Sequence, residues 1–442
     1  MLGYISIFLG MATIIILLMR RWNPIIVGLV AATIVIVLNG LSFEKTMTKF
    51  YFEGFATMFK TLFPVIFSGN LLAQIYNRTG AMSSIGDKVT NLVFKEGSSA
   101  TQKYIFCILS MVLSSGLISY FGMNSLVTLI AMYPLCLRMM EKAGIPKRFV
   151  MGILSAGVYT FAMTAPGSAE VVNVLAMEAV GTTSTVGIVG GLVASITEIA
   201  VMTIVMTLMI KKAVRAGERF SYGPKDIVFD DNREKPSFIL SLLPLLVLFV
   251  LFNLAKMNIF LVTLIAWILS MLFFIKYLPM GQKREIILET IDNAVKATFG
   301  PVGSVGSIVG FTTILQSIPE FQNMLNAIFN LRLPAVFIVL FAIFIVAAMT
   351  SSSSAAIRVG IPMILDKCRQ AGLTDAFIHR VSCFASSVVD TLPYGTAIII
   401  NLQIADLDMK EGYPPMFVST TLATFCGTVI CALTMGLFPS LP

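Results

Sequence analysis

The chain has 442 residues, of which 57% are hydrophobic and only 12% are charged. Soluble proteins carry about 25% charged residues, so half of the usual charge is missing. The mean hydropathy is +0.89. This composition excludes a soluble enzyme, a secreted disulfide scaffold and a disordered tail protein. Because a membrane helix needs about 20 apolar residues, it predicts an all-α polytopic membrane protein.

The net charge of +8 does not indicate a nucleic-acid partner, because the basic clusters are short and lie between apolar runs. The six cysteines form no C-x-x-C pair and His379 is the only histidine, so we expect neither a disulfide framework nor a metal site. The first apolar run, 2–19, is followed by Arg20 and Arg21 rather than by a cleavage site. We interpret this run as a retained helix and not as a signal peptide.

Apolar runs of helical length follow one another along the chain. The first half contains the runs 2–19, 24–39, 54–76, 104–121, 123–140, 149–180 and 186–210. The second half contains 237–254, 258–278, 295–316, 334–349, 352–366, 377–403 and 415–437. The only long polar segment, 211–236, separates the two halves. The runs are continuous rather than alternating, which excludes a β-barrel.

The two halves match each other at an offset of 228 residues. Nine identities fall between 125 and 173, more than composition alone gives, and they include Ser125 with Ser353 and Asn173 with Asn401. The pattern predicts a first repeat at 1–210, a linker at 211–236 and a second repeat at 237–442.

Loop charges predict that the two repeats have opposite orientations. Four basic residues, Arg138, Lys142, Lys147 and Arg148, lie at the end of the run 123–140 and in the loop after it. The equivalent loop of the second half mixes Lys367 and Arg369 with Asp366 and Asp375. By the positive-inside rule the first loop and the linker are cytoplasmic and the second loop is external. Inverted repeats of this kind are typical of secondary transporters.

Four polar interruptions occur in the apolar runs, as two symmetric pairs. The segments 120–125 and 350–354 each lie between short apolar arms, which predicts the tips of two re-entrant hairpins. The segments 164–168 and 390–396 contain Pro and Gly, which predict two helices broken in the middle of the membrane. Free backbone amides and hydroxyls at such breaks can bind an anion or a small cation. The same Ser and Thr residues are also compatible with helix packing alone.

Three ionisable residues lie near these interruptions: Asp390, Glu170 and Arg358. A charged group inside the membrane costs several kcal/mol, which indicates a function. Arg358 is able to bind a carboxylate with two hydrogen bonds, or to form a structural pair with Asp390. Glu198 is compatible with a position near the membrane interface. His379, beside Arg380 at a loop end, is interpreted as a solvated residue rather than as a proton relay.

The breaks resemble the gluconate permease (GntP) family of the ion transporter superfamily. The segment from His379-Arg380 through Asp390-Thr391-Leu392-Pro393 to Gly395 is similar to the family pattern H-R-x5-S-G-x-x-D-T-L-P-H-x-G-A, with Tyr394 at the position of its second His. The segment Pro166-Gly167-Ser168 with Asn173 resembles a P-G-S-x4-N pattern of one branch. The H-G-F-x-P-P-H-P-G-P segment of the gluconate branch is absent.

The resemblance implies cation-coupled uptake of a small organic anion by an elevator-like mechanism. We therefore expect a non-enzymatic symporter of the inner (plasma) membrane, possessing no cofactor beyond its H⁺ or Na⁺ and forming a homodimer. The expected substrate-binding residues are Asn124, Ser125, Thr164, Gly167, Ser168, Ser351, Ser352, Ser353, Ser354, Arg358, Thr391, Gly395 and Thr396. The expected coupling-ion residues are Asp390, Glu170, Asn173 and Asn401. The alternative is a cation/proton antiporter without an organic substrate.

Overall fold

A computed structural model describes residues 2–439, except 21, 82–83, 86, 89–96, 121–124, 169, 225, 227–233, 254, 256, 279–282, 322 and 325–333. The described residues are helical and contain no strand. Seven of their helical segments are long and apolar enough to cross a membrane: Leu2–Met19, Phe43–Tyr76, Ala100–Tyr120, Ile188–Arg215, Phe260–Tyr277, Lys283–Ser317 and Met409–Leu437. The predicted all-α membrane architecture is therefore confirmed.

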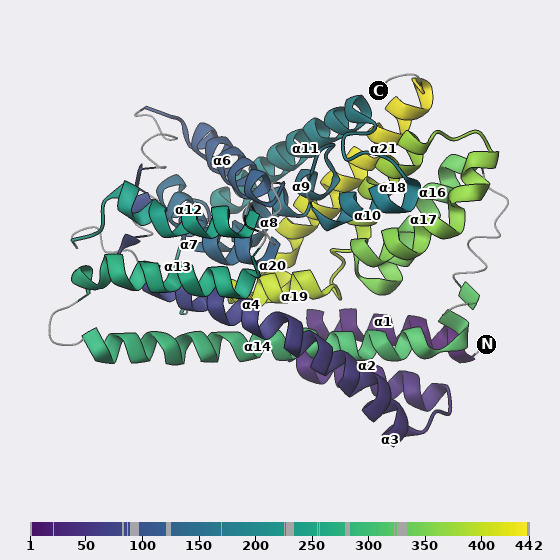
Figure 1. The fold of residues 1–442 in the computed structure, drawn as a ribbon, viewed down its shortest axis with the longest axis horizontal. Helices are drawn as coiled ribbons and strands as arrows, with labels where there is room; N and C mark the ends of the chain where they lie inside the picture. Colours follow the sequence, from purple (N-terminus) through teal and green to yellow (C-terminus); the bar gives the residue numbers. More distant parts are fainter. Residues whose placement is uncertain are drawn as a thin grey trace.

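The helices fall into two groups. The straight group consists of α1 (Leu2–Met19), α2 (Pro24–Leu38), α3 (Phe43–Thr46), η1 (Met47–Tyr51), α4 (Phe52–Arg78), α12 (Phe238–Asn253), α13 (Ile259–Phe274), η3 (Ile275–Tyr277) and α14 (Lys283–Ser317). Figure 1 shows α14 as a long helix with α1, α2 and α4 beside it.

The broken group contains the interruptions. Its first half is α6 (Ala100–Tyr120), α7 (Ser125–Ala143), η2 (Lys147–Phe149), α8 (Val150–Val158), α9 (Phe161–Thr164), α10 (Val171–Val180) and α11 (Ile188–Arg215). Its second half is α16 (Ala335–Thr350), α17 (Ser353–Gln370), α18 (Asp375–Val389), α19 (Thr396–Ile404), α20 (Met409–Met416), η4 (Phe417–Leu422) and α21 (Ala423–Leu437). In Figure 1 most of this group lies on the other side of α4 and α13 from α14.

Close backbone packing holds the straight group together. A Cβ atom on Gly28 of α2 would lie 2.7 Å from the carbonyl oxygen of Ser307 on α14, so only a glycine lets these helices approach so closely. The Ser307 hydroxyl donates to the Ile25 carbonyl at 2.7 Å and shares a 2.6 Å hydrogen bond with the Tyr51 hydroxyl. Within lipid the hydrophobic effect does not drive helices to associate. Close backbone contact and hydrogen bonds between α2 and α14 stabilise their association instead.

An apolar seam joins the two groups. It is lined by aliphatic side chains from α4, α7, α14 and α19, namely Ile66, Leu126, Ile130, Val302, Val305 and Ile400. Gln403 donates one hydrogen bond across this region to the Ser304 hydroxyl, at 2.6 Å. Aliphatic contacts are not directional, so the seam fixes the relative position of the two groups less strictly than hydrogen bonds would.

The repeat offset relates residues at similar places in the folded chain. Ser353 is the first residue of α17, and Ser125, 228 positions earlier, is the first described residue of α7. In the straight group, Asn70 Nδ2 donates to Thr298 Oγ1 at 3.2 Å, and these two residues are also 228 positions apart. Two π-helical turns, η1 and η4, were not predicted from the sequence, because they leave no mark on hydropathy.

Candidate functional site

The first break lies between α9 and α10 and is closed by its own side chains. Gly167 has a φ of +84°, and its N–H donates to the Ser184 carbonyl at 2.8 Å. The Ser168 hydroxyl donates to the Ala162 carbonyl and accepts from the Glu170 N–H, so it bridges the two sides of the break. A second interruption separates α8 from α9 at Thr160, which the sequence did not predict.

The second break lies between α18 and α19. The Gly395 N–H donates to the Leu392 carbonyl at 2.7 Å, and a Cβ atom on Gly395 would lie 2.7 Å from the Asp390 carbonyl oxygen. A side chain at position 395 would therefore clash with the turn. Thr391 is completely buried, and its hydroxyl shares a 3.2 Å hydrogen bond with that of Thr421 on η4.

The turn between α16 and α17 is formed by serines. Ser351 adopts a left-handed φ of +48°, and the Ser352 hydroxyl accepts the Ala355 N–H at 3.2 Å as the N-cap of α17. Ser351, Ser352 and Ser354 are half-buried, whereas Ser353 is buried. Residues 121–124, at the equivalent turn between α6 and α7, include the predicted Asn124 and lie outside the described residues.

Each helical hairpin contacts the break of its own half through a serine and a carboxylate. Ser125 Oγ donates to Glu170 Oε1 at 2.7 Å, and Ser353 Oγ donates to Asp390 Oδ2 at 2.7 Å. The two serines occupy equivalent positions at the starts of α7 and α17. The second oxygen of Asp390, Oδ1, is buried and has no side-chain partner among the described residues.

Tyrosine hydroxyls make a second link between hairpin and break in each half. Tyr120 at the end of α6 donates to the Pro166 carbonyl at 2.8 Å, and Tyr394 in the second break donates to the Ala348 carbonyl at 2.7 Å. Tyr159 is buried between the two breaks, where it interacts electrostatically with both Asp390 and Glu170. In each half, the described residues of the hairpin therefore contact the break of that same half.

A buried His-Arg pair from α18 holds the first break. Arg380 is 0% exposed and donates five hydrogen bonds. Its Nη1 donates to the Thr164 carbonyl at 2.8 Å and to Asn173 Oδ1 at 3.1 Å. Its Nη2 donates to the carbonyls of Ser184 and Val186, and its Nε also donates to the Val186 carbonyl. Among the described residues no carboxylate contacts Arg380. This leaves a positive charge beside the break without a neutralising anion.

His379 is also buried, which corrects the interpretation of this residue as a solvated side chain at a loop end. Its Nε2 lies 2.9 Å from Asn173 Oδ1 and its Nδ1 lies 2.6 Å from the Thr182 hydroxyl. The predicted ion ligand Asn173 therefore has internal partners, including the Ser168 carbonyl, to which its Nδ2 donates at 2.8 Å. Sequence alone placed the pair beside a polar loop, but α18 packs against α9, α10, α16 and α21.

Arg358, by contrast, is exposed on α17. The hydrogen bond that Asp390 receives comes from Ser353 and not from Arg358. Of the other predicted residues, Thr164 lies in the first break with its hydroxyl donating to the Thr160 carbonyl at 3.1 Å. Thr396 begins α19 and is half-buried, and the buried Asn401 amide faces Tyr159.

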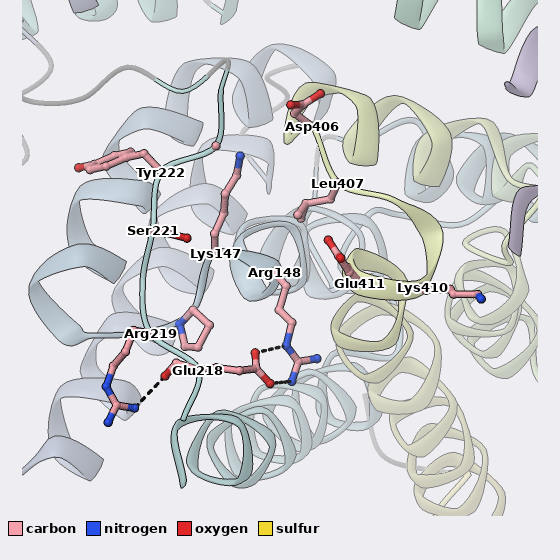
Figure 2. Close-up of a pocket in the computed structure, with 12 residues that line it drawn as sticks. Lys147, Arg148, Glu218, Arg219, Ser221, Tyr222, Asp406, Leu407, Lys410 and Glu411 are labelled. Carbon is pink, nitrogen blue, oxygen red and sulfur yellow. Dashed lines mark hydrogen bonds and ion pairs between the residues drawn. The ribbon is translucent and has the colours of Figure 1, made fainter. Parts of the chain in front are cut away.

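The linker packs on one end of the broken group and lines an open cavity of about 710 Å³ there. Figure 2 shows Lys147 and Arg148 between two groups of lining residues. One group comes from the linker (Glu218, Arg219, Ser221 and Tyr222) and the other from the α19–α20 connection and the start of α20 (Asp406, Leu407, Lys410 and Glu411). Arg148 binds Glu218 with two hydrogen bonds of 2.7 and 3.0 Å, and Lys147 pairs with Asp226 at 2.7 Å. Lys147 and Arg148 therefore have internal acidic partners, whereas Arg219 donates to the carbonyls of Val214 and Glu218.

Asp87 connects the other end of the linker to α7. It contacts Arg138 at 2.9 Å and also pairs with Lys235. Burial acts to raise the pKa of the Asp87 carboxyl, but the hydrogen bonds and charges of Lys235 and Arg138 outweigh it, so the pKa is lowered. The carboxylate thus stays ionised at neutral pH and ties the linker to the hairpin.

No protein-family model matches the chain. A protein of Bacillus subtilis (strain 168) named "Uncharacterized transporter YxjC" is 22% identical over 435 residues, and the match covers 88% of this chain and 89% of that protein. Together with the apolar helices, this similarity identifies the chain as a multi-pass membrane transporter.

Proposed function

We propose that the protein is a secondary active symporter that uses a cation gradient, H⁺ or Na⁺, to accumulate a small organic anion. The observation that carries the proposal is Arg380, a buried cation whose partners are backbone carbonyls and one amide oxygen. An unneutralised positive charge within the membrane favours an anionic ligand. The resemblance of the breaks to gluconate permeases supports a sugar acid, a hydroxy acid or a short-chain carboxylate as the substrate class.

Two reciprocal sets of contacts support an inverted repeat. The loop after α7 lies beside the α19–α20 connection in the cavity of Figure 2, while Arg369 at the end of α17 donates to the Val180 carbonyl at the end of α10, at 3.0 Å. Each hairpin base thus meets the broken helix of the other half. The 3.2 Å contact between Asn70 and Thr298 is expected for equivalent residues close to a two-fold axis.

We further propose that the straight group is a fixed scaffold and that the broken group moves as the carrier of an elevator-type cycle. The scaffold is joined by close backbone contacts, whereas the aliphatic seam between the groups includes Leu126 and Val305. Nonpolar side chains are able to slide past one another without breaking hydrogen bonds. We place the protein in the inner (plasma) membrane as a homodimer.

The topology is tested by attaching a membrane-impermeant thiol reagent to single cysteines in intact cells. Ser221→Cys lies in the exposed part of the linker, and Ala371→Cys lies at the exposed end of α17. We expect the reagent to label Ala371→Cys in intact cells and Ser221→Cys only after the membrane is opened. Wild-type protein is the control for its six cysteines, of which five are buried. The reverse labelling pattern would contradict the orientation.

The function is tested in proteoliposomes with radiolabelled gluconate, glycerate and lactate. We expect at least one of them to accumulate above its external concentration when a proton or sodium gradient is imposed, and to leak out when an ionophore removes that gradient. Cation exchange without uptake of any carboxylate would instead support the antiporter alternative, in which Asp390 and Glu170 bind only ions.

A further inference from the structure

Glu198 is a buried carboxyl that lies outside the two breaks and their hairpins. It lies near the middle of the apolar helix α11, and its side chain is 0% exposed. α11 packs along α21, and the two helices run side by side in Figure 1. Neither carboxyl oxygen of Glu198 has a hydrogen-bond partner among the described residues. Glu198 therefore lies within the helix packing and not on an exposed face of α11.

One face of α21 forms the wall of this site. A Cβ atom on Gly427 would lie 2.7 Å from Glu198 Cγ, so the glutamate side chain packs directly on the backbone of α21. The Thr424 hydroxyl faces the carboxyl from the turn before, and Cys431 faces it from the turn after. Ser195 lies one turn before Glu198 on α11, and its buried hydroxyl also has no partner among the described residues.

No cation contacts the Glu198 carboxyl within the described part of the chain. The other elements that pack on α11 are α8, α9 and η4, which contain no acidic or basic residue, and α6, whose titratable residues are Lys103, Tyr104, Cys107 and Tyr120. On α18, Arg380 packs on α11 at Gly191, seven residues before Glu198, and its hydrogen bonds go to the first break.

An isolated ionised carboxylate at this depth costs several kcal/mol, so the group must be neutralised. A metal cation would need a shell of several oxygen ligands. Here α11 is a continuous helix whose carbonyls are already bonded, and the described residues contain no cluster of three metal-binding side chains. A proton needs only the carboxyl itself. We propose that Glu198 is a proton-binding site of the transport cycle, separate from the two breaks.

This inference rests on the proposed symport and names a proton as one of the coupling ions. If Glu198 takes up and releases a proton once per cycle, substrate accumulation depends on the pH gradient through this residue. Glu198→Gln has the same shape as the protonated acid and cannot release a proton. It should therefore uncouple uptake from the pH gradient without preventing the carrier from moving its substrate.

The test uses purified protein in sodium-free proteoliposomes and the carboxylate that wild-type protein accumulates. We expect Glu198→Gln to lose at least tenfold in accumulation driven by a pH gradient, while its exchange of labelled for unlabelled substrate at equal pH stays within twofold of wild type. Glu178→Gln is the matched control, because it removes an exposed carboxyl from α10. Its gradient-driven accumulation should equal that of wild type.

Two further results separate the possible failures. Dicyclohexylcarbodiimide, which attacks protonated carboxyls in apolar surroundings, should modify the peptide that contains Glu198 in wild-type protein, as detected by mass spectrometry. Normal gradient-driven accumulation by Glu198→Gln, or wild-type accumulation that responds to sodium but not to pH, would overturn the inference and leave the symport standing. Absence of carboxylate transport in wild type would overturn the proposed function itself.

Discussion

Replacing Arg380 with methionine should abolish carboxylate uptake and destabilise the protein. The substitution removes a buried charge and five hydrogen bonds, and it leaves the carbonyls of Thr164 and Val186 without the arginine donors that they have in wild type. Hydrogen bonds to charged groups contribute about 1.5–3 kcal/mol each. The loss of even two of them should lower the melting temperature by on the order of 10 °C.

Arg380→Lys separates charge from geometry. Lysine keeps the charge but has three donors on one nitrogen, so it cannot reproduce the planar fork that reaches carbonyls on both sides of the break. We expect this variant to insert into the membrane, to melt at a lower temperature than wild type, and to take up substrate at least tenfold more slowly. Arg215→Met, at an exposed position of α11, is the control for loss of a surface arginine.

A comparison of Arg380→Met with Arg358→Met shows which of the two arginines attracts the substrate. The sequence indicated Arg358 as the carboxylate-binding residue, but its side chain is exposed on α17, whereas Arg380 is fully buried. Uptake that is lost in Arg358→Met and retained in Arg380→Met would reject Arg380 as the cation that attracts the substrate. Uptake that is lost only in the Arg380 variants would show that the buried charge is the one that matters.

The interruptions were predictable because proline and glycine act locally. Pro166 and Gly167 cannot continue a helix, and in the folded chain α9 ends at Thr164 and the helix resumes at Val171. The start of α17 was equally predictable, because serines favour helix N-caps and Ser352 occupies that position. Local chemistry thus located the two breaks and the turn between α16 and α17.

Burial was not predictable in the same way, because it depends on which helices pack together. His379 and Arg380 lie only a few residues after a polar loop, yet α18 runs inward at once and its first turns contact α9 and α10. The burial of Glu198 was not predictable for the same reason. An apolar helix that contains one carboxylate has the same sequence pattern whether that carboxylate faces the lipid or packs against α21. A hydroxyl on the facing helix, such as Thr424, shows only in the folded chain.

Asp390→Asn should abolish uptake in every mode, both the accumulation driven by a gradient and the exchange at equilibrium. Asp390 is buried at the second break, where Ser353 donates to one of its oxygens and the other has no side-chain partner among the described residues. A cation bound at that second oxygen would neutralise the carboxylate while the substrate anion is nearby. Asparagine retains the acceptor for Ser353 but loses the charge, so the cation should no longer bind.

This expectation differs from that for Glu198→Gln, which should lose only the response to the pH gradient. The hydrogen bond from Ser353 to Asp390 is probed by Ser353→Ala, which leaves the charge of Asp390 in place but removes about 1.5 kcal/mol of its stabilisation. Binding of the cation at Asp390, and with it binding of the substrate, should therefore weaken about tenfold. Ser168→Ala is less specific, because Ser168 bridges the first break and its loss also changes the break itself.

This series has two controls. One is the substitution of an exposed carboxylate, and the other is the melting temperature, which shows whether each variant is folded. Asp366→Asn removes an exposed acid from α17, and its uptake should match that of wild type. Melting temperatures of the Asp390→Asn and Ser353→Ala proteins should lie within a few degrees of wild type, because asparagine and alanine fit the same space. Normal uptake by a well-folded Asp390→Asn protein would remove this residue from the mechanism. Wild-type affinity in Ser353→Ala would show that the serine serves only to pack α17 against the break.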